Sequence, residues 1–142
     1  MIILVLVLAA CSSKPHESTV SQPGGRPLFD RIGGMDGIKG LIKDFVEDEV
    51  SRDSRINVRF TNVDKPLLEE ALAVQVCELT GGPCKYTGKS MKDAHAGMSI
   101  SDADFVAFVE DLQKSLAKFK VPDAEQRELL RAINKLRDHV IE

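Results

Sequence analysis

Aromatic side chains, glycine and proline are all scarce in this sequence. The chain of 142 residues has no tryptophan, one tyrosine and six phenylalanines, so aromatic residues make up only 5% of it. Such a chain offers few stacking platforms for single-stranded nucleic acid or for sugars. Ten glycines and six prolines, set among long stretches rich in Leu, Ala, Glu, Lys and Asp, exclude collagen-like and disordered classes and disfavour an all-β fold. The expected class is all-α.

An excess of positive charge is also missing. With 19 basic and 22 acidic side chains the net charge is -3, which removes the electrostatic footprint of a nucleic-acid binder. The sequence contains no glycine-rich phosphate loop, no Ser/His/Asp set and no CxxC motif. The three histidines, His16, His95 and His139, are too few and too widely spaced for a zinc site. The length suits one domain with one core.

The first ten residues, MIILVLVLAA, form an apolar run that is too short to span a bilayer and suits the central region of a secretory signal. The run ends in LAAC at residues 8–11, which resembles a bacterial lipobox. That resemblance implies a lipid on Cys11 and a protein exported to the periplasmic side of a bacterial membrane. No Lys or Arg precedes Lys14, which departs from an ordinary signal. The alternative is a buried strand or short anchor that keeps its cysteine.

Residues 12–27 contain three prolines, two glycines and a single large aliphatic residue, Val20. This composition cannot bury enough apolar surface to order itself, so we expect a flexible linker. His16 lies in this linker and is expected to be solvated. The folded domain is therefore predicted to cover residues 28–142.

Within residues 28–142 the turn residues and apolar spacing predict helices. A short segment should end at Gly33-Gly34, and longer helices should cover residues 36–51 and 65–80. Ser101 and Asp104 have the spacing of a capping box, and Pro122 opens the last predicted helix. The apolar faces of the four helices comprise Ile38, Leu41, Ile42, Phe45, Val46 and Val50; Leu68, Leu72, Val76 and Leu79; Phe105, Val109, Leu112, Leu116 and Phe119; and Leu129, Ile133, Leu136 and Val140.

Three motifs are specific enough to resemble one protein family. The run GGPCKYTGKSMKDAHAGMSIS at residues 81–101, preceded by LFDRIGG at 28–34 and followed by FKVPDAE at 119–125, resembles the group 1 truncated hemoglobins in order and spacing. The similarity covers residues 28–141. It implies a two-over-two helical sandwich around haem b that binds O2, CO or NO.

The resemblance assigns His95 as the axial ligand of the haem iron, a role that neutral imidazole serves in globins. Without it, His95 could equally be a surface histidine in a loop. Met91 lies one turn earlier and is expected on the same face of the haem. Phe60 and Phe105 match family aromatics that pack on the porphyrin, although both could simply fill the core. We give no haem role to His139.

The residues expected on the gas-binding side of the haem differ from those of the family. Relatives usually carry a tyrosine directly after the phenylalanine of the second helix, where this chain has Val46. Counting back from Gly81 without gaps, the facing positions on the next helix are Leu68, Leu72 and Val76. All four are apolar, so we expect weak retention of O2, with CO and NO less affected. A one-residue shift of this helix would bring Gln75 inward.

Cys77 and Cys84 remain once Cys11 is assigned to the lipid. In the oxidising compartment that a signal implies, we expect them to form a disulfide. The alternative is one small buried hydrophobic residue and one free thiol.

Two classes of function stay open at this point. The first is a haem module that binds a diatomic gas for carriage, scavenging or sensing. The second is a haem enzyme, such as an NO dioxygenase or a peroxidase, which would need a reductase partner and polar groups above the iron. The apolar positions favour the first class. A weaker third possibility is a helical lipoprotein scaffold without haem.

Overall fold

The computed structural model describes residues 25–142, and helices account for all the regular secondary structure there. The predicted signal and most of the predicted linker lie outside this range. Within it, no helix is both long and apolar enough to cross a membrane. The elements are α1 (Leu28–Arg31), α2 (Gly34–Asp44), the π-helix η1 (Phe45–Glu49), α3 (Val50–Arg52), the 3₁₀-helix η2 (Asn57–Phe60), α4 (Lys65–Leu79), α5 (Met91–His95), α6 (Asp102–Lys118), α7 (Asp123–Asn134) and α8 (Arg137–Val140).

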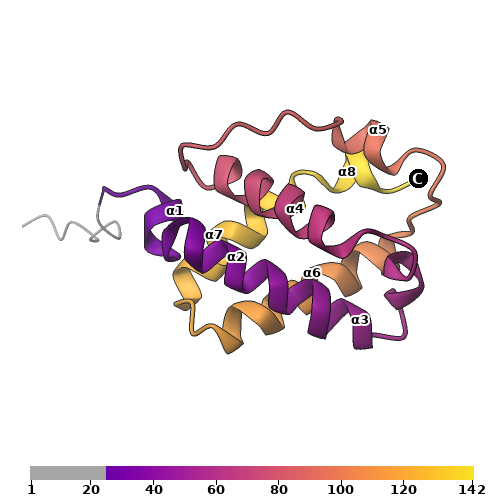
Figure 1. Ribbon diagram of the computed structural model, residues 1–142, viewed down its shortest axis with the longest axis horizontal. Helices are drawn as coiled ribbons and strands as arrows, with labels where there is room; N and C mark the ends of the chain where they lie inside the picture. The colour runs from indigo at the N-terminus through magenta and orange to yellow at the C-terminus, as the bar shows by residue number, and fades with distance from the viewer. Residues whose placement is uncertain (1–24) are drawn as a thin grey trace, which may run out of the picture.

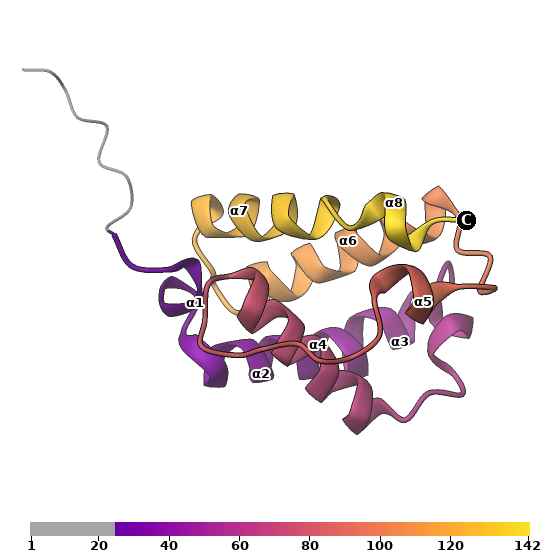
Figure 2. The same ribbon diagram turned by 90° about the horizontal axis from the view of Figure 1, so that it is seen from above.

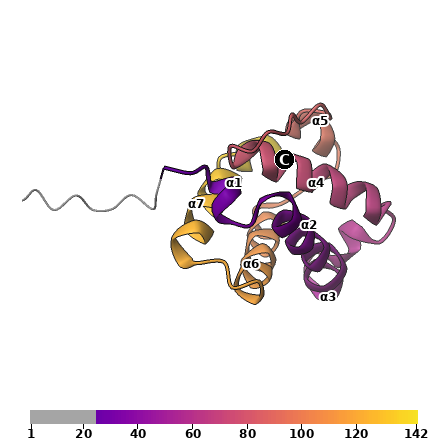
Figure 3. The same ribbon diagram turned by 60° about the vertical axis from the view of Figure 1, so that its left-hand side comes forward.

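The long helices form two layers (Figures 1 and 2). One layer contains α2 and α4, and the other contains α6 and α7. Viewed from the end that carries α1, the short first helix lies against the start of α7 (Figure 3). A single cluster of buried apolar side chains fills the space between the layers. This arrangement confirms the all-α prediction.

The helix starts follow the predicted capping residues. The Asp64 carboxylate accepts a hydrogen bond from the Leu67 N–H at 3.0 Å, with Pro66 in the first turn of α4. The Ser101 side chain accepts from the Asp104 N–H, while the Asp104 carboxylate accepts from the Ser101 N–H, so both halves of the capping box are present. Each cap satisfies backbone donors that would otherwise lack a partner.

The predicted helix over 36–51 is interrupted by one turn of π-helix at η1. A π turn takes up one residue more than an α turn, so side chains beyond it are rotated around the axis. An uninterrupted α-helix would already place Val50 one turn beyond Val46, at a spacing of four, and the π turn places it one turn beyond Phe45, at a spacing of five. Val50 is fully buried like Phe45 and Val46, so its predicted place on the apolar face is confirmed.

The last predicted helix also differs from the structure, because it divides into α7 and α8. The Asn134 side chain donates to the Leu130 carbonyl, and the Leu136 N–H bonds to Ile133 in a tighter turn that ends α7. At the end of α6, Phe119 was expected on the apolar face but is 43% exposed. It is the residue after the last helical turn, and its ring lies over Gly40 of α2 rather than inside the core.

Candidate functional site

One large cavity lies between the two layers. It holds about 940 Å³ of space outside the protein atoms, including the part that is open to solvent. Its walls come from α2 with η1, from α4, from α5, from α6 and from the α7–α8 segment, with the loops around Ile56 and Ile100 at its edges. The lining is mainly apolar, and its polar residues are Arg59, Gln75, His95 and Asp104.

The cavity brings together seven of the eight residues predicted to contact a cofactor. Those that line it are Phe60, Leu68, Leu72, Val76, Met91, His95 and Phe105. They come from η2, α4, α5 and α6, so residues separated by up to 45 positions in sequence meet here. Val46 is the exception. It is fully buried but does not line the cavity, and Phe45 occupies the cavity wall at this point instead.

His95 is half-buried at the end of the five-residue helix α5. Its Nδ1 atom lies 2.7 Å from the Met91 carbonyl oxygen. A carbonyl oxygen can only accept, so Nδ1 donates its proton and the lone pair of the neutral ring resides on Nε2. Within the described part of the chain Nε2 makes no hydrogen bond. A histidine held in this way by a backbone carbonyl has the orientation and tautomer typical of a metal ligand.

Gln75 also faces the cavity, although Leu68, Leu72 and Val76 keep their predicted positions. Its amide Nε2 donates to the Met91 sulfur at 2.9 Å and so links α4 to α5. The amide is therefore engaged with the histidine-bearing helix. The wall formed by α2, η1 and the rest of α4 is apolar: Ile42, Phe45, Leu68, Leu72 and Val76.

The charged pair at the cavity edge is already satisfied within the protein. Arg59 lies 2.8 Å from the Asp104 carboxylate and also donates to backbone carbonyls of the loop that follows α5. Hydrogen bonds from Ser101, together with the Arg59 cation, hold the pKa of Asp104 below its usual value. Asp104 is therefore expected to stay ionised and bound to Arg59 rather than act as a proton donor in the cavity.

The end of α4 is fixed by a disulfide between Cys77 and Cys84, which joins α4 to the loop leading to α5. Cys77 is fully buried and directly follows the cavity residue Val76. The chain turns here at Gly81 and Gly82. A side chain at Gly82 would lie 2.6 Å from the Cys77 sulfur and 2.5 Å from the Phe29 ring, so only glycine fits. The predicted lipidation site, Cys11, lies outside the described residues.

Several cavity residues were not identified from the sequence as part of a site. Phe45 and Phe108 meet edge to face, with ring centroids 4.9 Å apart, and both line the cavity. Leu136 and Val140 line it from the C-terminal segment. Their spacing in the sequence predicted that they lie on an apolar helix face. That this face lines the cavity depends on the chain reversal between α6 and α7, which the spacing does not show.

The donor set defines the class of group that such a cavity can hold. No group of three or more His, Cys, Asp or Glu side chains suited to a bare metal ion exists in residues 25–142. One imidazole in a large apolar cavity instead suits an iron whose other ligands belong to a macrocycle, as in haem proteins. The fold and cavity thus have the features of a globin-type helical protein.

The comparison with protein families agrees with this class. Residues 27–142 match the bacterial-like globin family, and the chain belongs to it. A group 1 truncated hemoglobin of Tetrahymena pyriformis is 29% identical over 114 residues, covering 80% of this chain and 93% of that protein. One from Synechocystis is 31% identical over 103 residues, covering 68% of this chain and 80% of that one.

The fold is also similar to a solved structure. The crystal structure of the truncated hemoglobin from Tetrahymena pyriformis in its Fe(III) form matches with a TM-score of 0.78 and 28% identity, over 82% of this chain and 98% of that one. The two-over-two helical arrangement predicted from the sequence is therefore confirmed. The match thus covers nearly the whole of that relative.

Proposed function

We propose that this protein binds haem b through His95 and reversibly binds a diatomic gas, O2, CO or NO, on the opposite face of the haem. The observation that carries the proposal is the hydrogen bond between His95 Nδ1 and the Met91 carbonyl, which leaves Nε2 as the coordinating atom in an apolar cavity. Membership of a globin family supports the haem. Bound haem would supply an open coordination position for the gas.

The residues of this chain then have distinct tasks. His95 would hold the iron, and Phe60 and Phe105 would pack on the porphyrin. Leu68 and Leu72, with the rest of the apolar wall, exclude water from the gas-binding side and offer no hydrogen-bond donor to a bound gas. O2 bound to iron is strongly polarised and depends on such a donor more than CO does, so we expect fast O2 release. This wall favours gas binding over oxygen chemistry, which uses polar groups to steer bond cleavage.

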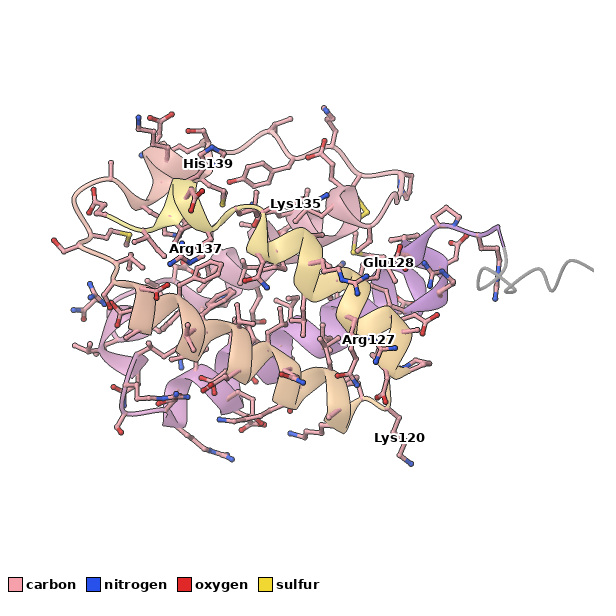
Figure 4. The ribbon with its side chains drawn as sticks, turned by 180° about the vertical axis from the view of Figure 1, so that it is seen from behind. Lys120, Arg127, Glu128, Lys135, Arg137 and His139 are labelled. Atoms are coloured by element: carbon pink, nitrogen blue, oxygen red, sulfur yellow. A yellow bond between two sulfur atoms is a disulfide. The ribbon has the colours of Figure 1, made fainter. Side chains whose placement is uncertain are left out.

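The test is an absorption spectrum of the purified chain after reconstitution with haem. We expect a Soret band with one haem per chain, and loss of the five-coordinate ferrous spectrum in His95→Ala. His139→Ala is the matched control, because that histidine is exposed on α8 (Figure 4). An unchanged spectrum and haem affinity in His95→Ala would show that another residue holds the iron.

We further propose that the protein is exported and anchored by a lipid on Cys11. The apolar run and the LAAC sequence support the anchor. The disulfide between Cys77 and Cys84 supports an oxidising compartment such as the periplasm. Fatty-acid labelling and fractionation with membranes should both be lost in Cys11→Ser. A wild-type chain that stays unlabelled in the soluble fraction would refute the anchor.

A further inference from the structure

The turn that follows His95 has an unusual backbone. Gly97 has a φ of +77°, and Ser99, which carries a side chain, has a φ of +51°. A positive φ at a residue other than glycine is uncommon and persists when surrounding contacts hold it. The Met98 side chain between them is 44% exposed, so apolar burial of the turn itself does not supply those contacts.

The C-terminal residue supplies one set of contacts. The two carboxylate oxygens of Glu142 accept hydrogen bonds from the N–H groups of Gly97, at 2.7 Å, and Ser99, at 2.6 Å. The backbone N–H of Glu142 donates to the Ile100 carbonyl at 3.0 Å. The bonds from the Gly97 and Ser99 amides lower the pKa of Glu142, so the carboxylate is ionised at neutral pH.

Arg59 supplies the second set of contacts from the opposite direction. Its guanidinium donates to the Met98 carbonyl at 2.5 Å and to the Ser99 carbonyl at 3.1 Å, and it also pairs with Asp104 at the start of α6. Glu142 thus binds the donors of the turn while Arg59 binds its acceptors. The two residues are 83 positions apart in sequence and meet on the same three-residue turn.

The segment that carries Glu142 is itself held in place. Arg137 of α8 pairs with Asp102 at the start of α6, at 2.5 Å, and lies on the outer face of the molecule near His139 (Figure 4). Leu136 and Val140 of the same segment line the cavity. Figure 1 shows α8 beside α5, and the two helices are in contact. The C-terminal segment therefore lines the cavity together with His95.

Helix α5 is held by its contacts with α8 and, through Gln75 and Met91, with α4. It has only five residues, and none of them is buried. A helix this short is not stable by itself. The Met91–Gln75 contact and the Ser90 cap hold its beginning, while His95 stands at its end, two residues before Gly97. The position of the histidine thus depends on what fixes the following turn.

We propose that Glu142 and Arg59 are positioning residues that clamp the turn Gly97–Ser99 and thereby fix the orientation of His95 toward the haem iron. This clamp rests on the proposed function, because it gives the turn a role in holding an iron ligand. It adds a requirement outside the cavity lining. The side-chain carboxylate of Glu142 must be present for a well-defined bond between His95 and the iron.

The variants are Glu142→Ala, which removes both acceptors, and Glu142→Gln, which keeps one acceptor oxygen. Asp138→Ala is the matched control, since it removes a carboxylate four residues earlier that is 89% exposed and pairs with Arg137. In the full chain without haem, amide hydrogen exchange at Gly97 and Ser99 should become about tenfold faster in Glu142→Ala, less so in Glu142→Gln, and stay unchanged in the control. This measurement does not depend on haem.

The haem-loaded proteins supply the second readout. In Glu142→Ala we expect haem to transfer to an acceptor apoglobin about tenfold faster, and the resonance Raman band of the iron–histidine bond to broaden or shift. The midpoint of thermal unfolding should fall by the same small amount in Glu142→Ala and in Glu142→Gln. A larger change of the iron–histidine band and of haem transfer in Glu142→Ala then separates a change at the iron from a general loss of stability.

The outcomes separate the clamp from the proposed function. Unchanged exchange at Gly97 and Ser99 overturns the clamp. Faster exchange with an unchanged iron–histidine band and haem transfer rate also overturns it, because the turn is then held without positioning His95. If the wild type takes up no haem, the proposed function fails and the positioning role fails with it. If the wild type binds haem normally and only the variant results fail, the proposed function stands alone.

Discussion

The Nδ1 atom of His95 donates to the carbonyl oxygen of Met91, one turn earlier in the same helix, at 2.7 Å. A neutral carbonyl fixes the ring without drawing its proton away. A carboxylate at the same place would make the imidazole a more basic ligand, because second-shell groups tune ligand basicity. The carbonyl partner of His95 therefore supports the proposed gas binding over a site that pushes electrons toward an iron-bound oxygen.

The first prediction concerns the character of the axial bond. The ferrous protein should show an iron–histidine stretching band in the range of neutral imidazole ligands, measured by resonance Raman spectroscopy. Peroxidase turnover with a small reducing substrate should be correspondingly slow. A band in the range of imidazolate-like ligands, together with rapid peroxidase turnover, would contradict the assignment of a gas-binding function.

The second prediction concerns the apolar wall of the cavity that α2, η1 and α4 form. Leu72 lies on this wall, and Leu72→Gln would introduce an amide donor that can reach a bound O2. One such hydrogen bond contributes about 1–2 kcal/mol, so O2 dissociation should slow by roughly five- to thirtyfold. CO dissociation should change much less, because bound CO is less polar. Stopped-flow measurement of both rates is the test.

Val46→Tyr is the informative partner of that variant. Val46 is fully buried and does not line the cavity, so a tyrosine there would overpack the core rather than reach the gas. We expect it to lower the free energy of unfolding by about 1–3 kcal/mol without slowing O2 release. Slower O2 release in Val46→Tyr but not in Leu72→Gln would mean that η1 presents residue 46 to the cavity.

The long helices could be predicted because their signals are local. Asp64 and Ser101 cap their helices with side-chain oxygens three residues from the bonded N–H, and the apolar spacing of α4 and α6 matches the helical period. The Gly81-Gly82 turn is equally local in sequence. The π turn at η1 was not predicted, because Val50 lies five residues after Phe45 but four after Val46, so the same sequence also fits an uninterrupted α-helix.

The site divides in the same way. Residues such as His95 and Leu72 could be placed because a motif or a helix face fixes them. Val46 was placed by the resemblance alone, and it is fully buried but does not line the cavity, whose wall its neighbour Phe45 forms. Arg59 and Glu142 could not be found from the sequence, because their contacts with the turn after His95 span 39 to 45 positions.

The third prediction concerns the disulfide. Residues 25–142 should show no free thiol under non-reducing conditions and two after reduction, because Cys77 and Cys84 are bonded and the third cysteine precedes this range. Closing a loop of this size stabilises the fold by about 2.5 kcal/mol in the chain-entropy relation.

Cys84→Ala is the cleaner variant for that test, since Cys84 is only half-buried. We expect it to lower the free energy of unfolding by about 2 kcal/mol under oxidising conditions and to have little effect once the wild type is reduced. Cys77→Ser should cost more, because it also places a hydroxyl group in a fully buried position. Equal stability of oxidised and reduced wild type would contradict the prediction.

The last prediction concerns the ion pair that joins α1 to the start of α7. Arg31 of α1 lies 2.8 Å from Glu125 at the start of α7, and the two side chains are only 11% and 9% exposed. The hydrogen bond from Arg31 lowers the pKa of Glu125 below its ordinary value of 4.5. A carboxyl group with a lowered pKa stabilises the fold above its unfolded-state pKa, and that contribution is lost as the pH falls through the folded-state value.

Arg31→Met should therefore lower the free energy of unfolding by about 1–2 kcal/mol at pH 7, since it leaves a largely buried carboxylate without its partner. The difference from wild type should begin to shrink below about pH 4.5 and become small once the pH has fallen through the lowered folded-state pKa of Glu125, where Glu125 is neutral in both proteins. Arg52→Met is the matched control, because Arg52 is 78% exposed in its pair with Asp48 and should contribute less than about 0.5 kcal/mol. Urea unfolding at several pH values measures both differences. A difference for Arg31→Met that stays constant between pH 7 and pH 3 would show that Arg31 acts through its apolar stem and not through Glu125.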